Sequence, residues 1–262
     1  MSAPELASVN GEIGPTAEAM VPLQDDGLYR GDGAFEVIKL YAGRPFALPE
    51  HIERLTRSAG SIELEFDVGG LSREIDALLD EFGDADGQLR LIVTRGGRRL
   101  AMTEPLPDFG PTATVATVTY MPTVILNGVK SLSYAANMQA TRLAKAHGAD
   151  DAIFVTPDGT ILESPTSTLF WVSDGTLRTT ALEAGVLDSI TRRRILAEME
   201  VEEGTWQVDD LIGASEAFLA STAREIQGIS AVDGQSLESA PGPRTQEATE
   251  AFADVLKREL EA

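Results

Sequence analysis

Short apolar segments rich in β-branched residues recur along this chain, each bounded by Gly, Pro or Asp, and they restrict it to folds built around β-sheets. The clearest are AFEVIKLY at 34–41, TATVATVTY at 112–120 and TLFWV at 168–172. Helical patterns separate them, and no repeat or low-complexity tract interrupts the order. The sequence therefore predicts a mixed α and β protein.

The first half of the chain predicts an α+β unit. After the strand at 34–41 come a turn at Gly43, a strand RPFAL and a helix that opens at Pro49. A second helix is predicted from Leu71, with a stripe of apolar residues at helical spacing, and the strands QLRLIVTR and TATVATVTY follow. We place this unit at residues 1–120.

A break in the apolar pattern at Met121, Pro122 and Thr123 suits a linker between two domains. The second domain, 121–262, begins with a helix at 135–147 and continues with strands at 151–156, 168–172, 216–222 and 224–232. A helix capped by Ser189 and a final amphipathic helix after Pro243 complete it. This domain is the larger and richer in strands.

Composition excludes several classes of function. A formal charge of −21 repels phosphate backbones and anionic lipids, so neither nucleic acid nor membrane is an expected partner. The chain has no Cys and only two His, which argues against a thiolate or histidine-rich metal site, and we expect no metal. It shows no leader peptide and no apolar segment long enough to span a membrane, so a cytoplasmic location is the default expectation.

Amine chemistry in this protein depends on four lysines. Lys257 and Lys145 lie in charged helical segments where a solvated surface role explains them, and Lys39 alternates with apolar residues in a strand and reaches either solvent or a cleft. Lys130 differs, because it stands in the uncharged stretch GVKSLSY that leads from an apolar segment into a helix. Lys130 is therefore the candidate for imine formation with an aldehyde cofactor.

Pyridoxal phosphate, held in this way, needs an acid near its ring nitrogen and a cup for its phosphate. Glu163, at the end of a short strand before Ser164 and Pro165, is the candidate acid. Amide, hydroxyl and guanidinium donors for the phosphate are available from Ser189, Ile190, Thr191, Ser221, Thr222 and Arg54. Each of these residues could instead have a purely structural role as a helix cap, a surface charge or a strand-end hydroxyl. The hypothesis of a phosphate site therefore depends on their joint occurrence.

Six motifs in order resemble the class IV, or fold-type IV, pyridoxal-phosphate aminotransferase family, which includes branched-chain and D-amino-acid aminotransferases and aminodeoxychorismate lyase. The motifs are GDGAFEVIKLYAG, HIERL, VKSLSYAANM, ILESPTSTLFWV, GVLDSITRRRI and FLASTAREI. The resemblance covers most of the chain. It implies a two-domain fold with the cofactor between the domains, and a homodimer.

The resemblance also implies roles for individual residues. Lys130 would form the Schiff base and act as the catalytic base, Glu163 would pair with the pyridine nitrogen, and Tyr134 would hydrogen bond to the ring hydroxyl. Phosphate would be held by Arg54, Ile190, Thr191, Ser221 and Thr222. Two positions depart from the common pattern, because many relatives have Asn where Thr168 and Ser133 stand here.

The implied activity is transfer of an amino group between a small-molecule amino donor and a 2-oxo acid acceptor. GDGAFEVIKLY is similar to the D-amino-acid aminotransferase pattern, whereas lyases often carry Thr near Glu36 or Val37, so transamination is preferred over the lyase reaction that releases aminobenzoate and pyruvate. A non-catalytic binding protein on the same fold is the third alternative. L-branched, D-amino acid and (R)-amine donors all stay open.

Residues that would contact the substrate are expected from two parts of the chain. By resemblance, the amides of Thr222 and Ala223 would meet the substrate carboxylate. Arg95 and Arg98, in the segment TRGGRRL, either bind a carboxylate or form a solvated hairpin tip. Phe35 and Lys39 complete the expected pocket.

Overall fold

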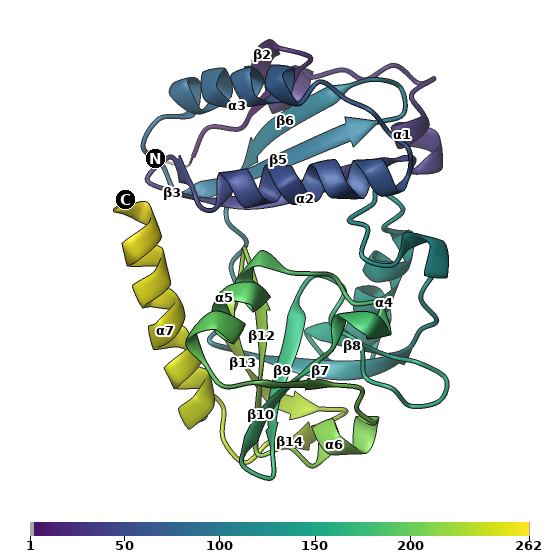
Figure 1. The fold of residues 1–262 in the computed structure, drawn as a ribbon, viewed down its shortest axis with the longest axis vertical. Helices are drawn as coiled ribbons and strands as arrows, with labels where there is room; N and C mark the ends of the chain where they lie inside the picture. Colours follow the sequence, from purple (N-terminus) through teal and green to yellow (C-terminus); the bar gives the residue numbers. More distant parts are fainter. Residues whose placement is uncertain (1–2, 262) are drawn as a thin grey trace. The chain divides into compact units, whose positions relative to one another are not determined.

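The computed structural model describes residues 3–261, which form two compact units. The first contains the chain up to Pro107 together with Val129–Tyr134. The second contains Asp108–Gly128 and Ala135–Glu261. The mixed α and β class with two sheets, predicted from the sequence, is confirmed (Figure 1).

The first unit is built on a six-stranded antiparallel sheet in the order β2-β1-β6-β5-β3-β4. Its strands are β1 (Leu6–Val9), β2 (Glu12–Pro15), β3 (Gly33–Tyr41), β4 (Arg44–Pro45), β5 (Gly87–Thr94) and β6 (Arg99–Glu104). The short helical elements η1 (Thr16–Glu18) and α1 (Asp26–Arg30) lie between β2 and β3 in the chain. β3 pairs with β4 along one edge and with β5 along the other, both in antiparallel orientation.

Two helices, α2 (Leu48–Ser61) and α3 (Val68–Phe82), pack on one face of this sheet and bury a common apolar core (Figure 1). The core contains Ile38 and Leu40 of β3, Leu55 of α2, and Ile75 and Leu78 of α3. The apolar stripe predicted for the second helix is therefore the buried one. The helix begins at Val68 and not at Leu71, because the Asp67 side chain caps it by accepting a hydrogen bond from the Gly70 amide.

The second unit contains an eight-stranded mixed sheet. Its main path runs β11-β10-β9-β12-β13-β7-β8, and β14 pairs with β13. The strands are β7 (Thr112–Thr119), β8 (Asp151–Val155), β9 (Thr168–Ser173), β10 (Thr176–Thr180), β11 (Glu202–Gly204), β12 (Glu216–Ser221), β13 (Glu225–Val232) and β14 (Gln235–Ser236). Both faces of β9 and β12 are buried, which explains their nearly continuous apolar sequences.

Helices cover this sheet and fill three apolar clusters. The helices are α4 (Ala135–Ala146), α5 (Ile190–Glu198), α6 (Val208–Ile212) and α7 (Pro243–Leu260), with 3-10 turns η2 (Val124–Leu126) and η3 (Leu182–Ala184). Phe170 of β9 stacks on Phe218 of β12 with ring centroids 4.9 Å apart. Phe252 of α7 is buried, and this helix packs against β12, β13 and α5.

The boundary between the units differs from the division at residue 120 that we expected. β7 pairs in parallel with β13 and with β8, so its hydrogen bonds belong to the second sheet. The division in the structure therefore falls between Pro107 and Asp108, and the segment 129–134 returns to the first unit. Parallel pairing joins strands far apart in sequence, so local periodicity does not reveal it.

Strands β1, β2, β6, β10, β11 and β14 were not predicted from the sequence. β1 and β2 are short, and their residues are mixed in polarity. Residues of β6 pair with β5 along the whole of Arg99–Glu104, although Arg, Thr and Glu weaken the strand pattern. These strands are stabilised by their neighbours in the sheet.

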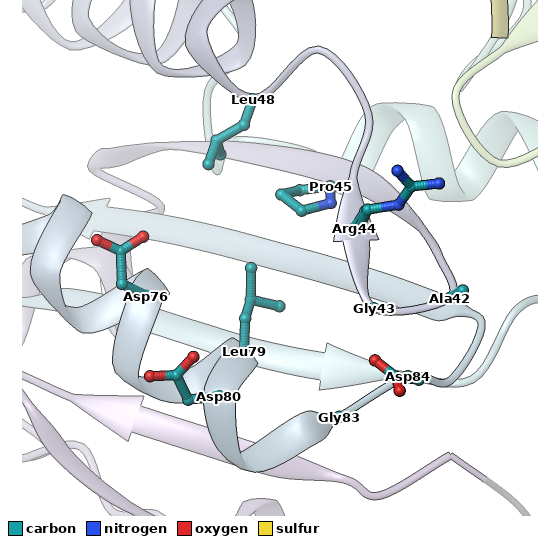
Figure 2. A pocket seen from close by; sticks show the side chains of 10 residues that line it. All are labelled: Ala42, Gly43, Arg44, Pro45, Leu48, Asp76, Leu79, Asp80, Gly83 and Asp84. Carbon is teal, nitrogen blue, oxygen red and sulfur yellow. The ribbon is translucent and has the colours of Figure 1, made fainter. Parts of the chain in front are cut away.

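A surface cavity of about 490 Å³ lies in the first unit, between the β3–β4 turn and the end of α3 (Figure 2). It is lined by Arg44, Pro45, Leu48, Leu79 and acidic residues of α3, and it contains none of the residues predicted to bind the cofactor. Among residues 3–261, no group of His, Cys, Asp and Glu is arranged to hold a metal ion. No helix in this range is both long and apolar enough to cross a membrane.

Candidate active site

Lys130 is bound to the first unit through its backbone, although it lies far along the chain. Its carbonyl accepts a hydrogen bond from the Phe35 amide at 3.0 Å, and its amide donates to Ser58 Oγ at 3.2 Å. The Leu132 amide donates to the Gly33 carbonyl at 2.8 Å. These bonds add the lysine segment to the start of β3 and to α2, which gives the side chain a defined position.

The Lys130 side chain lies beside two aromatic rings. Its Nζ is 4.5 Å from the centroid of the Phe35 ring and 5.9 Å from that of Tyr134. The two rings meet edge to face, with centroids 5.2 Å apart. An amine held against aromatic faces is half-buried and oriented. Of the residues predicted for the site, the structure brings Lys130, Tyr134 and Phe35 together.

Arg54 lies in a buried network with Glu36 and His51. Its Nε and Nη2 donate to the two carboxylate oxygens of Glu36, each at 2.7 Å, and His51 Nδ1 lies 2.8 Å from Glu36 Oε2. Glu36 and His51 are completely buried, and Arg54 is 5% exposed. The network connects β3 to α2 on the face where the helices pack.

The charges in this network follow from burial and pairing. Burial alone would raise the pKa of Glu36, but the hydrogen bonds and the charge of Arg54 lower it to about 2. Burial lowers the pKa of His51, and the positive charges of Arg54 and Lys130 add to the effect against the opposing pull of Glu36. His51 is therefore neutral at pH 7, and we assign Nδ1 as the protonated nitrogen that donates to Glu36.

Glu163 lies in the second unit, immediately after a short segment that pairs with β8. Its Oε1 accepts a hydrogen bond from the Leu187 amide at 2.9 Å, which orients the carboxylate and links it to the loop before α5. Nearby in sequence, Ser167 Oγ and Thr168 Oγ1 are buried without a hydrogen-bond partner among the described residues. Buried hydroxyls of this kind are expected beside a polar ligand.

The start of α5 is suited to an anion. Ser189 caps the helix by accepting a hydrogen bond from the Arg192 amide. The amides of Ile190 and Thr191 belong to the first turn, where an α-helix provides no carbonyl partner. Both residues are buried. Ser221 ends β12, and its Oγ accepts a hydrogen bond from the Arg224 amide. Thr222 and Ala223 are half-buried in the turn that follows.

Arg95 and Arg98 lie in the β5–β6 hairpin, and each forms an ion pair with an aspartate outside it. Arg95 donates to Asp32 and to the carbonyls of Ile62 and Glu63, and Arg98 Nη1 lies 2.6 Å from Asp25 Oδ2. These contacts anchor the hairpin to neighbouring loops. Lys39, the other predicted cation, lies 4.9 Å from the centroid of the Tyr41 ring.

Glu36 and His51 were not among the residues that we selected from the sequence, although both lie in the quoted motifs. A carboxylate within an apolar strand, followed by a helix with His and Arg three residues apart, is the signal that could have found them. Residues three apart share a face of a helix, so both side chains of α2 can reach the same carboxylate.

A family model described as amino-transferase class IV matches residues 33–232, and the chain belongs to this family. It is 31% identical to D-alanine aminotransferase from Bacillus licheniformis, over 95% of this chain and 96% of the relative. A putative branched-chain-amino-acid aminotransferase from Methanocaldococcus jannaschii is also 31% identical, over 94% and 95%. Aminodeoxychorismate lyase from Bacillus subtilis is 28% identical, over 96% and 94%.

Solved structures agree with this assignment. A fold IV transaminase from Curtobacterium pusillum matches with a TM-score of 0.85 and 27% identity, over 95% of this chain and 98% of that one. A hypothetical aminotransferase from Mycobacterium tuberculosis, solved in a form with pyridoxal phosphate bound, matches with a TM-score of 0.85 and 25% identity, over 95% and 97%. The fold is thus fold-type IV, and pyridoxal phosphate is the cofactor of the family.

The residues of this chain fit that cofactor. The first unit supplies an amine oriented by aromatic rings and a buried guanidinium. The second supplies an oriented carboxylate, the start of α5, and buried hydroxyls that have no hydrogen-bond partner within residues 3–261. An amine, a carboxylate and anion donors are the groups that pyridoxal phosphate requires.

Proposed function

We propose that this protein is an aminotransferase in which Lys130 holds pyridoxal phosphate and moves a proton during transfer of an amino group to a 2-oxo acid. The observation that carries the proposal is the position of Lys130 Nζ against the Phe35 and Tyr134 rings, on a segment bonded to β3 and α2. Such a lysine is held in place before any substrate arrives.

The reaction needs a group that accepts electrons from the substrate. Bound pyridoxal phosphate supplies an electron-withdrawing ring that stabilises negative charge on the substrate carbon. Glu163 keeps the ring nitrogen protonated, and the Leu187 amide keeps the Glu163 carboxylate oriented for this role. With the cofactor bound, Lys130 would hold it through its amine and would act as the base that removes and returns the proton at the substrate carbon.

The other cofactor residues divide between phosphate and ring. The amides of Ile190 and Thr191, the hydroxyls of Ser221 and Thr222, and Arg54 bind the phosphate. Support comes from the start of α5, where the first amides have no carbonyl partner inside the helix, and from Glu36, which accepts hydrogen bonds from Arg54. Tyr134 hydrogen bonds to the ring hydroxyl.

For the substrate, we propose an amino acid donor, branched-chain or of D configuration, or an (R)-amine, with Phe35 and Lys39 lining its pocket. Thr222 and Ala223 contribute amides toward the substrate carboxylate. Arg95 and Arg98 keep a supporting role in the hairpin, given their pairing with Asp32 and Asp25. A lyase that releases aminobenzoate and pyruvate is the second candidate, favoured by the lyase relative that is 28% identical.

A spectroscopic experiment tests the lysine and the reaction together. Purified protein supplied with pyridoxal phosphate should show an absorption band beyond the aromatic region, which Lys130→Ala should abolish and Lys145→Ala should retain, because Lys145 is exposed on α4. L-leucine, D-alanine, (R)-1-phenylethylamine and aminodeoxychorismate are then added separately without an acceptor. Conversion to the pyridoxamine form identifies a transaminase and its donor, whereas aminobenzoate release with the band retained identifies the lyase.

Absence of the band from the native protein would exclude the enzyme proposal. A non-catalytic protein of this fold would give that result. Retention of the band in Lys130→Ala would instead mean that a different amine binds the cofactor.

We also propose that the protein is a homodimer. Large apolar side chains are exposed in two segments, one in each unit. In the first unit Met20 is 83% exposed and Leu23 82%, and in the second Val124 is 79% and Ile125 84% exposed. Clusters of exposed apolar residues in sequence are typical of surfaces that become buried in an assembly.

A further inference from the structure

The hairpin between β12 and β13 has a turn of three residues, Thr222, Ala223 and Arg224. Ser221 pairs with Glu225 at its base, and the Arg224 amide donates to Ser221 Oγ at 3.3 Å. Glu225 adopts a left-handed backbone conformation, with φ of 56°. A residue other than Gly keeps such a conformation only where its surroundings fix it. The turn that carries the proposed phosphate donors is therefore held in one conformation.

Arg224, the last residue of this turn, has a largely buried side chain. Its guanidinium carbon lies 4.4 Å from the centroid of the Phe109 ring, and 10% of the side chain is exposed. Nη1 donates to Gln227 Oε1 at 2.5 Å, and Nη2 donates to Asp151 Oδ2 at 2.5 Å. Nε is buried and has no hydrogen-bond partner among residues 3–261. A buried ion pair thus links the turn to the start of β8.

Asp151 connects this turn to the segment that contains Glu163. Its Oδ2 also accepts a hydrogen bond from Ser164 Oγ at 3.2 Å, and Ser164 directly follows Glu163 in the chain. Its Oδ1 accepts from the Ala152 amide and from Thr141 of α4. Asp151 is 2% exposed and Ser164 is 1% exposed. One buried carboxylate therefore contacts both the neighbour of the proposed acid and the arginine beside the proposed phosphate donors.

The buried ion pair is an inefficient source of stability. Removing two charges from water costs most of the free energy that their pairing gains, and well-packed apolar side chains often stabilise a fold at least as well. The Nε of Arg224 adds to the cost, because it is a buried donor without an acceptor. What the pair does provide is geometry, since charged groups with fixed partners define the spacing of the segments that contain them.

We propose that Arg224 is a positioning residue, which through Asp151 fixes the turn at 221–223 relative to Glu163. This role rests on the proposed function, because the turn and Glu163 would bind the phosphate and the ring nitrogen of the same cofactor. Arg224 itself contacts neither cofactor nor substrate in this role. Without its guanidinium the turn loses the link to Asp151, and the phosphate donors no longer keep their spacing from Glu163.

Two ligands that differ only in the phosphate test this role without turnover. Titration of the cofactor-free chain, followed by the visible band against a Lys130→Ala blank, measures the Kd of pyridoxal phosphate and of pyridoxal. Loss of one hydrogen bond to a charged group corresponds to a change of about 10- to 100-fold in Kd. Arg224→Met should therefore raise the Kd of pyridoxal phosphate about 10-fold. It should leave the Kd of pyridoxal unchanged, because pyridoxal has no phosphate for the turn to bind.

A double-mutant cycle shows whether Arg224 acts through the turn. Thr222→Ala removes a proposed phosphate hydroxyl, and it should weaken binding of pyridoxal phosphate in the native protein but have little further effect in Arg224→Met. Independent roles would multiply the two losses. Arg224→Lys keeps a charge beside Asp151 without the planar two-pronged edge, so it should lose less affinity than Arg224→Met. A native protein whose affinity does not depend on Thr222 would contradict the role of Arg224.

Arg178→Met is the matched control. Arg178 also lies in the second unit, pairs with Asp210 at 2.6 Å, and has its guanidinium carbon 4.4 Å from the centroid of the Trp206 ring. None of these partners belongs to the proposed cofactor site, so the Kd of both ligands should be unchanged. Circular dichroism establishes that each variant is folded. If Arg224→Met does not fold, the same results are expected of Arg224→Met combined with Asp151→Asn, which leaves no unpaired buried charge.

The outcomes separate this role from the proposed function. Native protein that forms no visible band with pyridoxal phosphate would overturn the proposed function. Native protein that forms the band, with Arg224→Met binding pyridoxal phosphate equally well, would overturn the role of Arg224 alone. An equal loss for pyridoxal phosphate and pyridoxal, or an equal loss in Arg178→Met, would also overturn it, because general structural damage would then explain the change. Losses in Arg224→Met and Thr222→Ala that multiply would overturn it as well, because Arg224 would then act independently of the turn.

Discussion

Glu36, His51 and Arg54 form a cluster of buried ionisable side chains inside the first unit. The buried Glu36 carboxylate is stabilised because Arg54 donates hydrogen bonds to both of its oxygens. His51 also hydrogen bonds to one of these oxygens. Removing Glu36 takes the shared hydrogen-bond acceptor away from both Arg54 and His51. The network therefore contributes both to stability and to the position of the proposed phosphate residue.

Glu36→Gln should lower the free energy of unfolding by about 3–5 kcal/mol at pH 7, because it removes the carboxylate charge that pairs with the buried guanidinium of Arg54. The pKa of Glu36 in the folded protein, about 2, is below its ordinary value, so its contribution is complete above about pH 4.5 and is lost as pH falls toward 2. Urea unfolding of both proteins at pH 7 and at pH 3 measures this. The difference between them should shrink at the lower pH.

Glu104→Gln provides the comparison for this prediction. The Glu104–Arg90 pair is 29% exposed on each side, and pairs in contact with water contribute about 1 kcal/mol or less. A loss in Glu104→Gln as large as that in Glu36→Gln would contradict the importance that we assign to burial.

Among the elements, α3 shows how a short local signal sets a boundary. The apolar stripe from Leu71 is visible in sequence, but Gly69 and Gly70 at the start of the helix disfavour helical structure. Asp67 compensates by accepting a hydrogen bond from the Gly70 amide at 2.9 Å. The helix therefore begins at Val68, three residues before the start that periodicity predicts.

Asp67→Ala should destabilise the protein by about 1 kcal/mol, the ordinary cost of losing a helix cap. Thermal unfolding followed by circular dichroism measures the shift in Tm. Asp76→Ala, on the exposed face of the same helix, is the control and should cause no loss. Equal losses in the two variants would mean that the cap is not responsible.

For the whole molecule, the exposed apolar segments predict assembly in solution. Size-exclusion chromatography with light scattering should give twice the mass of one chain at micromolar concentration. Ile125→Glu should shift the protein toward the monomer, because it would place a charge in a surface buried by association. Leu182→Glu, outside both segments and 38% exposed, should remain dimeric. A native monomer would contradict the homodimer.

The linear sequence was sufficient for features that depend on near neighbours. Strands such as β3, β9 and β12 and the helices α2, α4, α5 and α7 were predicted because alternation, helical spacing and caps act over a few residues. Lys130 stood out for the same reason, as a lone charge in an uncharged stretch.

The tertiary structure alone decided features that join distant residues. β7 belongs to the second unit because its hydrogen bonds go to β13 and β8, and strand pairing over such separations leaves no periodic trace in sequence. The bonding of Lys130 to Phe35 and the ion pair between Arg224 and Asp151 likewise depend on how strands align. Local spacing determines which face a side chain takes, whereas only the packed sheet determines what it meets there.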